Sequence, residues 1–290
     1  MDLYYFIVFA CFSFAMGCCL ASFLNVCIWR IPRNESVVWP PSHCPKCNAR
    51  IAWYQNIPIL SWLALRGRCA NCRQPISVRY TVVELLGGIL FLLAYLQWAM
   101  PFFFGGSPIL GLVPARSLWL VPATWMLLTW LILMAFIDLE NFFFPTNLLY
   151  GGMVMGPLLS VLVPELQGET KSLLALAWSV GGGVFGFGFL GLLRLVFSKV
   201  LKKEAMGDGD PMLMAGIGSF FGPAAALMTI VLSSFFGSIV GAALLLRGKA
   251  KLGGFTAVPY GPYLVLGALV WIYWGPVILE WYLKLNGAGN

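Results

Sequence analysis

The chain has 290 residues, of which 60% are apolar and 10% are charged, and its formal net charge at pH 7 is +7. Soluble globular proteins carry about a quarter of charged residues, so this composition excludes a soluble globule and indicates a polytopic membrane protein. The basic residues are spread over several short segments and form no single stripe, which argues against a nucleic-acid partner and favours membrane lipids.

Apolar runs recur along the chain at lengths that can cross about 30 Å of hydrocarbon as helices. Seven runs are predicted as membrane helices: 3–28, 82–104, 117–137, 148–163, 173–197, 223–246 and 260–283. An eighth, shorter run, 212–221, follows Asp210. The runs together predict about eight transmembrane helices.

The first run is expected to stay in the membrane with its amino terminus outside. Asp2 replaces the basic residues of a cleavable signal, and Arg30 and Arg33 come after the apolar stretch. Most of the Lys and Arg residues gather in three clusters, which are 30–79, 194–203 and 247–251. Eight crossings put all three on one side, and the positive-inside rule predicts that this side is the cytosol.

Two C-x-x-C pairs lie in the polar segment after the first run: Cys44 with Cys47, and Cys69 with Cys72. The 21 residues between the pairs match the spacing at which two knuckles close a tetrahedral zinc site. Two disulfides or idle thiols are the alternatives, and a reducing cytosol disfavours the disulfides. Four thiolates leave no open coordination position, so the predicted zinc ion is structural.

The expected fold class is therefore an all-α polytopic membrane protein with a small cytosolic zinc-binding loop domain. We expect a first transmembrane helix at 1–29, a cytosolic four-cysteine zinc domain at 30–81 and a seven-helix membrane domain at 82–290. His43, the single histidine, adjoins the first cysteine pair and is expected to be structural. A Ser-His-Asp hydrolase or an H-E-x-x-H metalloprotease is therefore disfavoured.

Two aspartates are distinctive because they lie where apolar helices meet the predicted cytosolic face. Asp138 closes the third run before a mostly apolar stretch, and Asp210 ends the sequence Gly-Asp-Gly-Asp ahead of Pro211. Carboxylates near hydrocarbon are costly, which makes such residues functional candidates. Two carboxylates within reach of each other do not both ionise easily, and an aspartic protease needs one protonated and one ionised acid.

Both aspartates also have a structural interpretation. Asp210 before Pro211 has the pattern of a helix N-cap followed by proline in the first turn. Asp138 can be a helix-terminal residue at the membrane interface. The residues alone leave the catalytic and the structural interpretation open.

The segment 186–191 matches the G-x-G-x-x-G pattern of dinucleotide sites, but it lies inside an apolar run with no preceding strand. Gly182 and Gly186 are one helical turn apart, so we expect close helix packing there.

Further motifs extend through nearly the whole chain, at 17–26, 30–32, 42–47, 53–58, 65–67, 69–72, 76–85, 138–145, 207–210 and 260–264. In their identity and order these segments resemble the type IV prepilin peptidases, bifunctional leader peptidase/N-methyltransferases of type IV pilus and type II secretion systems. Two positions depart from the family pattern. Glu140 stands where the family usually has a second aspartate, and Met212 stands where it usually has a lysine.

The resemblance implies a GxGD-type aspartic endopeptidase of the bacterial inner membrane, with Asp138 and Asp210 as its catalytic pair. The implied substrates are type IV prepilins and pseudopilins, cut at the cytosolic membrane face after the glycine that ends a short basic leader. The implied second activity is methylation of the new N-terminus by S-adenosylmethionine, whose site the resemblance does not locate. Glu84, Glu140 and Asp208 are expected to attract the basic leader.

Two alternatives accompany this prediction. The chain can be a peptidase without methyltransferase activity. It can also be a non-enzymatic membrane assembly protein, in which the zinc module recruits a cytosolic partner and the aspartates cap helices.

Overall fold

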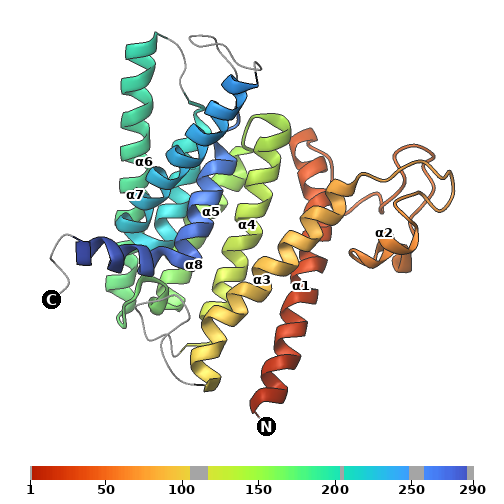
Figure 1. Cartoon of the computed structure of the whole chain (residues 1–290), viewed down its shortest axis with the longest axis horizontal. Helices are drawn as coiled ribbons and strands as arrows, with labels where there is room; N and C mark the ends of the chain where they lie inside the picture. The colour runs from red at the N-terminus through yellow and green to blue at the C-terminus, as the bar shows by residue number, and fades with distance from the viewer. Residues whose placement is uncertain (1, 105–116, 203–205, 248–257, 286–290) are drawn as a thin grey trace.

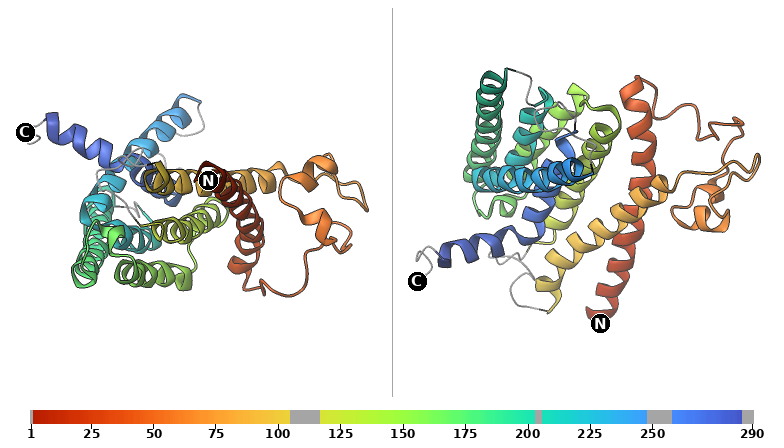
Figure 2. Two further views of the ribbon diagram at one scale, coloured as in Figure 1. Left: turned by 90° about the horizontal axis from the view of Figure 1, so that it is seen from below. Right: turned by 45° about the horizontal axis from the view of Figure 1, so that its top comes forward.

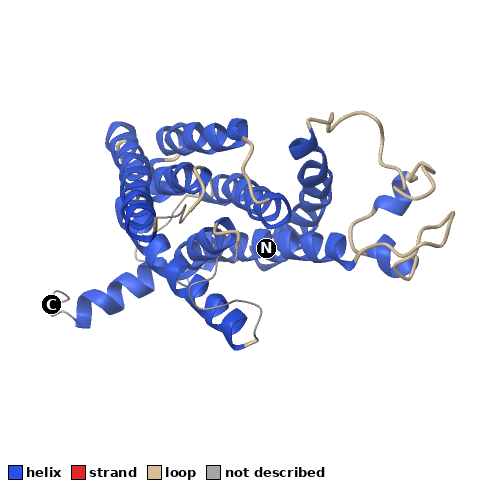
Figure 3. Ribbon diagram, turned by 90° about the horizontal axis from the view of Figure 1, so that it is seen from above, coloured by secondary structure: helices blue, strands red, loops and turns tan. Residues whose placement is uncertain are grey.

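The computed structural model describes residues 2–104, 117–202, 206–247 and 258–285, and within these ranges the chain is helical and has no strand (Figure 3). The long helices are α1 (Asp2–Arg30), α3 (Val78–Phe104), α4 (Leu120–Asn141), α5 (Thr146–Leu162), α6 (Ser172–Leu201), α7 (Gly209–Leu246) and α8 (Gly261–Leu285). The short elements are α2 (Leu60–Ala64) and the 3₁₀ turns η1 (Ile31–Arg33), η2 (Trp53–Asn56) and η3 (Pro164–Gln167).

The all-α membrane class is confirmed, whereas the count of eight transmembrane helices is not. By length and composition, five of the described helices can cross a membrane: α1, α3, α4, α6 and α7. The apolar parts of α5 and α8 are shorter. The predicted runs 212–221 and 223–246 both lie within α7, and the basic residues at 203 and 248–251 lie outside the described residues.

Helix α7 is sharply bent at Gly222, whose φ of 80° and ψ of −177° are not helical. A Cβ added to Gly218 would lie 3.3 Å from the Cβ of Ala226, although residues eight apart in a straight helix are separated by about 12 Å. The helix therefore folds back, and its two arms correspond to the two predicted runs.

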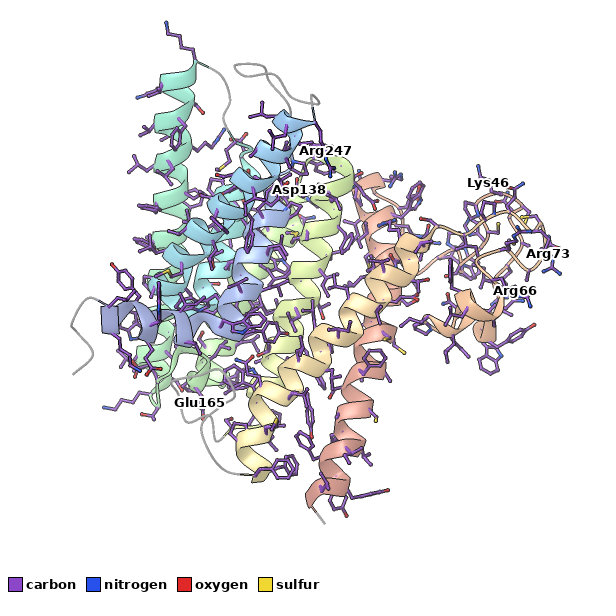
Figure 4. All side chains as sticks on the ribbon, viewed as in Figure 1. Lys46, Arg66, Arg73, Asp138, Glu165 and Arg247 are labelled. Atoms are coloured by element: carbon purple, nitrogen blue, oxygen red, sulfur yellow. The ribbon has the colours of Figure 1, made fainter. Side chains whose placement is uncertain are left out.

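The helices give the molecule two ends. Asp138 and Arg247 lie at one end of the molecule and Glu165 lies at the other (Figure 4).

Helix α4 runs through the middle of the bundle, and its buried face supplies much of the core (Figures 1 and 2). Around it, α1 packs along α3 and α6 packs along α7. Close packing at the glycines of α6 is confirmed, because a Cβ on Gly186 would lie 2.7 Å from the carbonyl oxygen of Met214. Neither Gly188 nor Gly191 has an atom within 4 Å of such a Cβ, so only part of the glycine pattern serves packing.

The segment between α1 and α3, residues 31–77, forms a separate small lobe beside the helices (Figure 1). We call it the four-cysteine lobe. It joins the bundle through the end of α1 and the start of α3. Of the cysteines in α1, Cys18 and Cys27 are buried and Cys11 and Cys19 are exposed.

Candidate active site and metal centre

Asp138 lies near the end of α4, and its side chain is 4% exposed. Its Oδ2 accepts a hydrogen bond of 2.9 Å from the backbone N–H of Gly261, the first residue of α8. The helix ends four residues later at Phe142, which adopts the left-handed conformation and donates its N–H to the Asp138 carbonyl oxygen. The carboxylate is therefore turned inward and held by a residue 123 positions away.

Asp210 lies in the first turn of α7 and is equally buried, at 4% exposure. Its Oδ2 accepts a hydrogen bond of 3.1 Å from the N–H of Gly207. The N-cap position belongs to Asp208, and no side chain caps the helix there. The N-cap interpretation of Asp210 is therefore wrong, and its carboxylate bonds backward to the glycine turn that precedes the helix.

The two carboxyl groups belong to one cluster of helix ends: Gly261, which donates to Asp138, and Gly209, which precedes Asp210, both lie against the ring of Phe144. The ring of Phe144 helps to set this proximity, because it contacts the backbone on both sides. A Cβ on Gly209 would lie 3.3 Å from Cγ of Phe144, and a Cβ on Gly261 would lie 3.1 Å from its Cε1. Three segments distant in sequence, the ends of α4, α7 and α8, therefore meet around one ring.

A cation also acts on Asp210, although the chain lacks the lysine that the family pattern has at position 212. Arg194 of α6 supplies it. Its Nε donates to the carbonyl oxygen of Met206 at 3.1 Å, and its guanidinium pairs with Asp208. Arg194 thus ties the glycine turn to α6.

The acidic residues expected to attract a basic leader already have partners. Glu140 forms an ion pair of 2.5 Å with Arg79 at the start of α3, and Asp208 pairs with Arg194. Oε2 of Glu84 accepts the N–H of Ile59 at 2.8 Å. Asp208 remains 88% exposed and is the one of the three most open to a further cation.

The sequence did not single out three residues of this site: Phe144, Arg194 and Gly261. Phe144 and Gly261 fall within family motifs, and Arg194 belongs to one of the basic clusters that indicate topology. Each acts through a contact with a distant segment, which leaves no local signal apart from the family motif.

The four cysteine sulfurs of the lobe lie within 4.8 Å of one another. Zinc–sulfur bonds of about 2.3 Å in a tetrahedron place sulfurs about 3.8 Å apart, whereas a disulfide needs about 2.05 Å. Sγ of Cys44 and Sγ of Cys72 are 3.9 Å apart, and all four thiols are free. The donor set therefore fits a tetrahedral thiophilic metal.

The two cysteine pairs are built alike. In each knuckle the first cysteine donates its N–H across the turn, Cys44 to Ala49 and Cys69 to Gln74, both at 2.9 Å. The residue after each second cysteine, Asn48 or Arg73, has a positive φ.

Hydrogen bonds favour the thiolate form, which metal ligation needs, at two of the four cysteines. The pKa of Cys47 is lowered to about 6, chiefly by the backbone of Ala49 and then by the side-chain amide of Asn71. The pKa of Cys69 is lowered as well, chiefly by the backbone of Cys72. At Cys72 the backbone bond with Gln74 lowers the pKa, but burial and the neighbouring cysteine side chains together raise it to about 11 in the absence of a metal. His43 is exposed, and its backbone pairs with that of Arg50 in an antiparallel bridge beside the first knuckle.

Comparison with known families gives two matches that together include both sites. Residues 15–98 match the bacterial peptidase A24 N-terminal domain, and residues 125–242 match the type IV leader peptidase family. The first range contains the four cysteines, and the second contains both aspartates.

Curated relatives agree with these matches. A prepilin leader peptidase/N-methyltransferase of Myxococcus xanthus is 38% identical over 84% of this chain and 65% of its own length. One of Stutzerimonas stutzeri is 32% identical over 96% of this chain and 95% of its own length. The type 4 prepilin-like proteins leader peptide-processing enzyme of Escherichia coli is 35% identical over 89% of this chain and 91% of its own length. No solved structure matched the chain.

Proposed function

The chain belongs to the type IV leader peptidase family, and from that premise we propose that Asp138 and Asp210 are the catalytic acids of a membrane aspartic endopeptidase. The observation that carries the proposal is the geometry of the two carboxylates. Both are buried, each accepts a backbone N–H from a glycine, and the glycines beside them, Gly209 and Gly261, lie against the same Phe144 ring. A capping role would require neither the burial nor the mutual approach.

The geometry supports a division of labour between the two acids. Carboxylates this close share a proton more easily than they carry two negative charges. The ionised acid draws a proton from the attacking water, and the protonated acid donates to the oxygen of the scissile carbonyl. Because the glycine N–H groups occupy one oxygen of each carboxylate, the other oxygen of each remains for water and substrate.

The protein is an enzyme of the prepilin leader peptidase/N-methyltransferase kind. Type IV prepilins and pseudopilins are its proposed substrates, cleaved where a basic leader meets an apolar helix. S-adenosylmethionine is the proposed methyl donor for the second reaction. The non-enzymatic assembly alternative loses its main support, since Asp210 does not cap its helix.

Zinc is the metal proposed for Cys44, Cys47, Cys69 and Cys72, because four thiolates at tetrahedral separation suit it. Bound there, it would hold the two knuckles together and supply folding energy to a segment with little core. We propose residues 30–81 as the zinc domain, between a first helix at 1–29 and the peptidase part at 82–290.

The proposed location is the bacterial inner membrane, with the zinc domain and both aspartates on the cytosolic side. The clustering of basic residues in 30–79 and 194–203 supports this orientation through the positive-inside rule.

Substitution of each aspartate by asparagine tests the catalytic assignment. Asp138→Asn and Asp210→Asn should each lower the rate of prepilin cleavage in detergent by about 10²- to 10⁴-fold, because each removes one proton-transfer group. Glu165→Gln is the control: this acid lies at the opposite end of the molecule from Asp138 (Figure 4), and the variant should stay within a few-fold of wild type. Correctly inserted Asn variants that still cleave prepilin at the wild-type rate would refute the assignment.

A further inference from the structure

We propose that the four-cysteine lobe does not stand free in water but lies on the bilayer beside the helices, held by an apolar patch and by anionic lipid headgroups. The apolar patch consists of five side chains from η2, α2 and the link between them: Trp53, Tyr54, Ile57, Leu60 and Leu63. The inference adds a lipid-binding surface to a segment whose proposed role is metal binding, and it does not depend on the peptidase assignment.

The patch is exposed, whereas the aromatic ring of the neighbouring residue Trp62 packs within the lobe. Trp53 is 81% exposed, Leu60 63% and Leu63 57%. Trp62, from the same short helix, points the other way: its Nε1 donates to the carbonyl oxygen of Ile76, and its ring packs on Gly67. Helix α2 therefore has an inner aromatic contact and an outer face that is also apolar. In a cytosolic module that outer face would be expected to be polar.

The aromatic members of the patch suit the boundary between lipid and water. Tryptophan and tyrosine gather at this boundary because their rings are partly apolar and partly polar. The hydroxyl of Ser61 donates to the Tyr54 carbonyl oxygen at 3.1 Å, which ties η2 to α2. The two elements that carry the patch are thus held to each other.

The charge of the lobe complements an anionic membrane. Between residues 36 and 83 the chain has no Asp or Glu and six basic residues: Lys46, Arg50, Arg66, Arg68, Arg73 and Arg79. The first five are exposed, whereas Arg79 is paired with Glu140. Four to eight basic residues next to a membrane helix are enough to attract anionic headgroups. A metal with four thiolates has a net charge of about −2 and would leave the lobe positive.

The position of the lobe decides between lipid and a protein partner. It stands to the side of the bundle and within the length of α1, and the view from above shows it clear of the other helices (Figures 1 and 3). Lys46, Arg66 and Arg73 all lie on this lateral projection (Figure 4). The lobe leaves α1 at Arg30 and rejoins the bundle at Val78, the first residue of α3, and these helix ends lie on the side proposed to be cytosolic. Beside these helix ends the surrounding medium is the headgroup region of the bilayer. The apolar patch of a lobe in this position meets lipid before it meets a soluble protein.

Fluorescence quenching of the full-length, metal-loaded protein in lipid nanodiscs tests the proposal. Wild type and Trp53→Phe are compared, so that the difference between them isolates Trp53. With a brominated lipid in a bilayer containing anionic phosphatidylglycerol, the Trp53 signal should fall about twofold and should be shielded from iodide in the water. A Trp53 signal that iodide quenches and bromolipid leaves unchanged would overturn the proposal.

A second arm separates the contribution of charge and covers the case in which a substitution disturbs the lobe. In anionic nanodiscs, the double variant Arg66→Glu, Arg68→Glu should show severalfold less bromolipid quenching of the Trp53 signal than wild type. Wild type should show the same loss of quenching when it is placed in purely zwitterionic lipid. Lys199→Glu is the control, since Lys199 is an exposed basic residue of α6 outside the lobe. Metal content shows whether the lobe is intact.

Equal quenching in zwitterionic and anionic discs would overturn the headgroup contribution. Shielding that appears only after a cytosolic extract is added would identify a protein partner and overturn the lipid assignment.

Discussion

Gly261 is the residue through which α8 reaches the candidate acid pair. Its N–H bonds Asp138, and its Cα lies against the ring of Phe144. A side chain has no room there, because a Cβ would lie 2.7 Å from Oδ2 of Asp138. At the scale of single residues, the site depends on small groups that bring backbone donors up to carboxylates.

Substitution of Gly261 by alanine should therefore impair catalysis more than folding. The added methyl group must displace either the Asp138 carboxylate or the Phe144 ring, and misplacement by about 1 Å can cost about 10²-fold in rate. We expect a fall of that order in kcat for prepilin cleavage. Gly188→Ala in α6 is the matched control, since its new Cβ would meet no atom within 4 Å. Equal activity of the two variants would contradict this role of Gly261.

Among the secondary-structure elements, the bent helix α7 requires the most support. Because Pro223 has no N–H, the carbonyl oxygen of Ser219 loses its helical partner. Two side chains replace it: Nε2 of Gln167 donates at 3.0 Å and the hydroxyl of Ser179 donates at 2.6 Å. Gln167 also donates to the carbonyl oxygen of Phe220 at 3.1 Å. The arm that carries Asp210 at its start is thus fixed at its far end by η3 and α6.

Replacement of Gln167 by leucine should destabilise the protein by about 1–2 kcal/mol, because the carbonyl oxygen of Phe220 loses this donor in an apolar environment and that of Ser219 keeps only the hydroxyl of Ser179. Unfolding in mixed detergent micelles, followed by circular dichroism, measures the loss. Ser238→Ala is the control, since that hydroxyl bonds to Ser234 within its own helical turn. If both variants unfold at the same denaturant concentration as wild type, Gln167 does not support the bend.

The whole molecule combines a helix bundle, which packs through apolar side chains, with a lobe that the cysteines organise. Few large side chains are buried in the lobe, where Cys44 and Gly67 are the fully buried residues between 31 and 77. The lobe and bundle should therefore respond differently to loss of metal.

Removal of metal with a chelator should unfold the lobe and leave the bundle helical, because the ligands would no longer hold the two knuckles together. Trypsin cleavage after Arg66, Arg68 and Arg73 should accelerate about tenfold or more, while the helical circular dichroism changes little. Cys44→Ser should reproduce the effect without a chelator. Cys11→Ser, a thiol of α1, should not. An unchanged trypsin pattern after complete removal of metal would argue against a structural metal.

The orientation of the molecule makes a separate prediction. A fluorescent protein fused after Lys202, at the end of α6, should fluoresce, because that end carries the basic cluster expected in the cytosol. Alkaline phosphatase fused after Leu285, at the end of α8, should be active, because α8 leaves the Asp138 end at Gly261 and runs away from it. Phosphatase activity after Lys202 would reverse the assigned orientation.

Local features of the sequence predict the membrane class, the four-cysteine knuckles and the two aspartates as site candidates. All three predictions rest on short stretches of sequence: hydropathy over 20 residues, the C-x-x-C spacing and an acid at the end of an apolar run. Such patterns can be recognised without knowing how the helices pack. The count of eight helices is not confirmed: the runs 212–221 and 223–246 are the two arms of α7, and composition cannot show that they meet in a bend at Gly222.

Only the tertiary structure decided how the candidate site is assembled and where the lobe stands. Gly261 reaches Asp138 across 123 positions, Arg194 comes from another helix, and Phe144 joins two glycines more than 50 residues apart. These contacts arise from the packing of whole helices, so no window of sequence contains them. The same holds for the lobe: its patch is exposed, and only the folded structure shows that it projects to the side of the helix bundle (Figure 1).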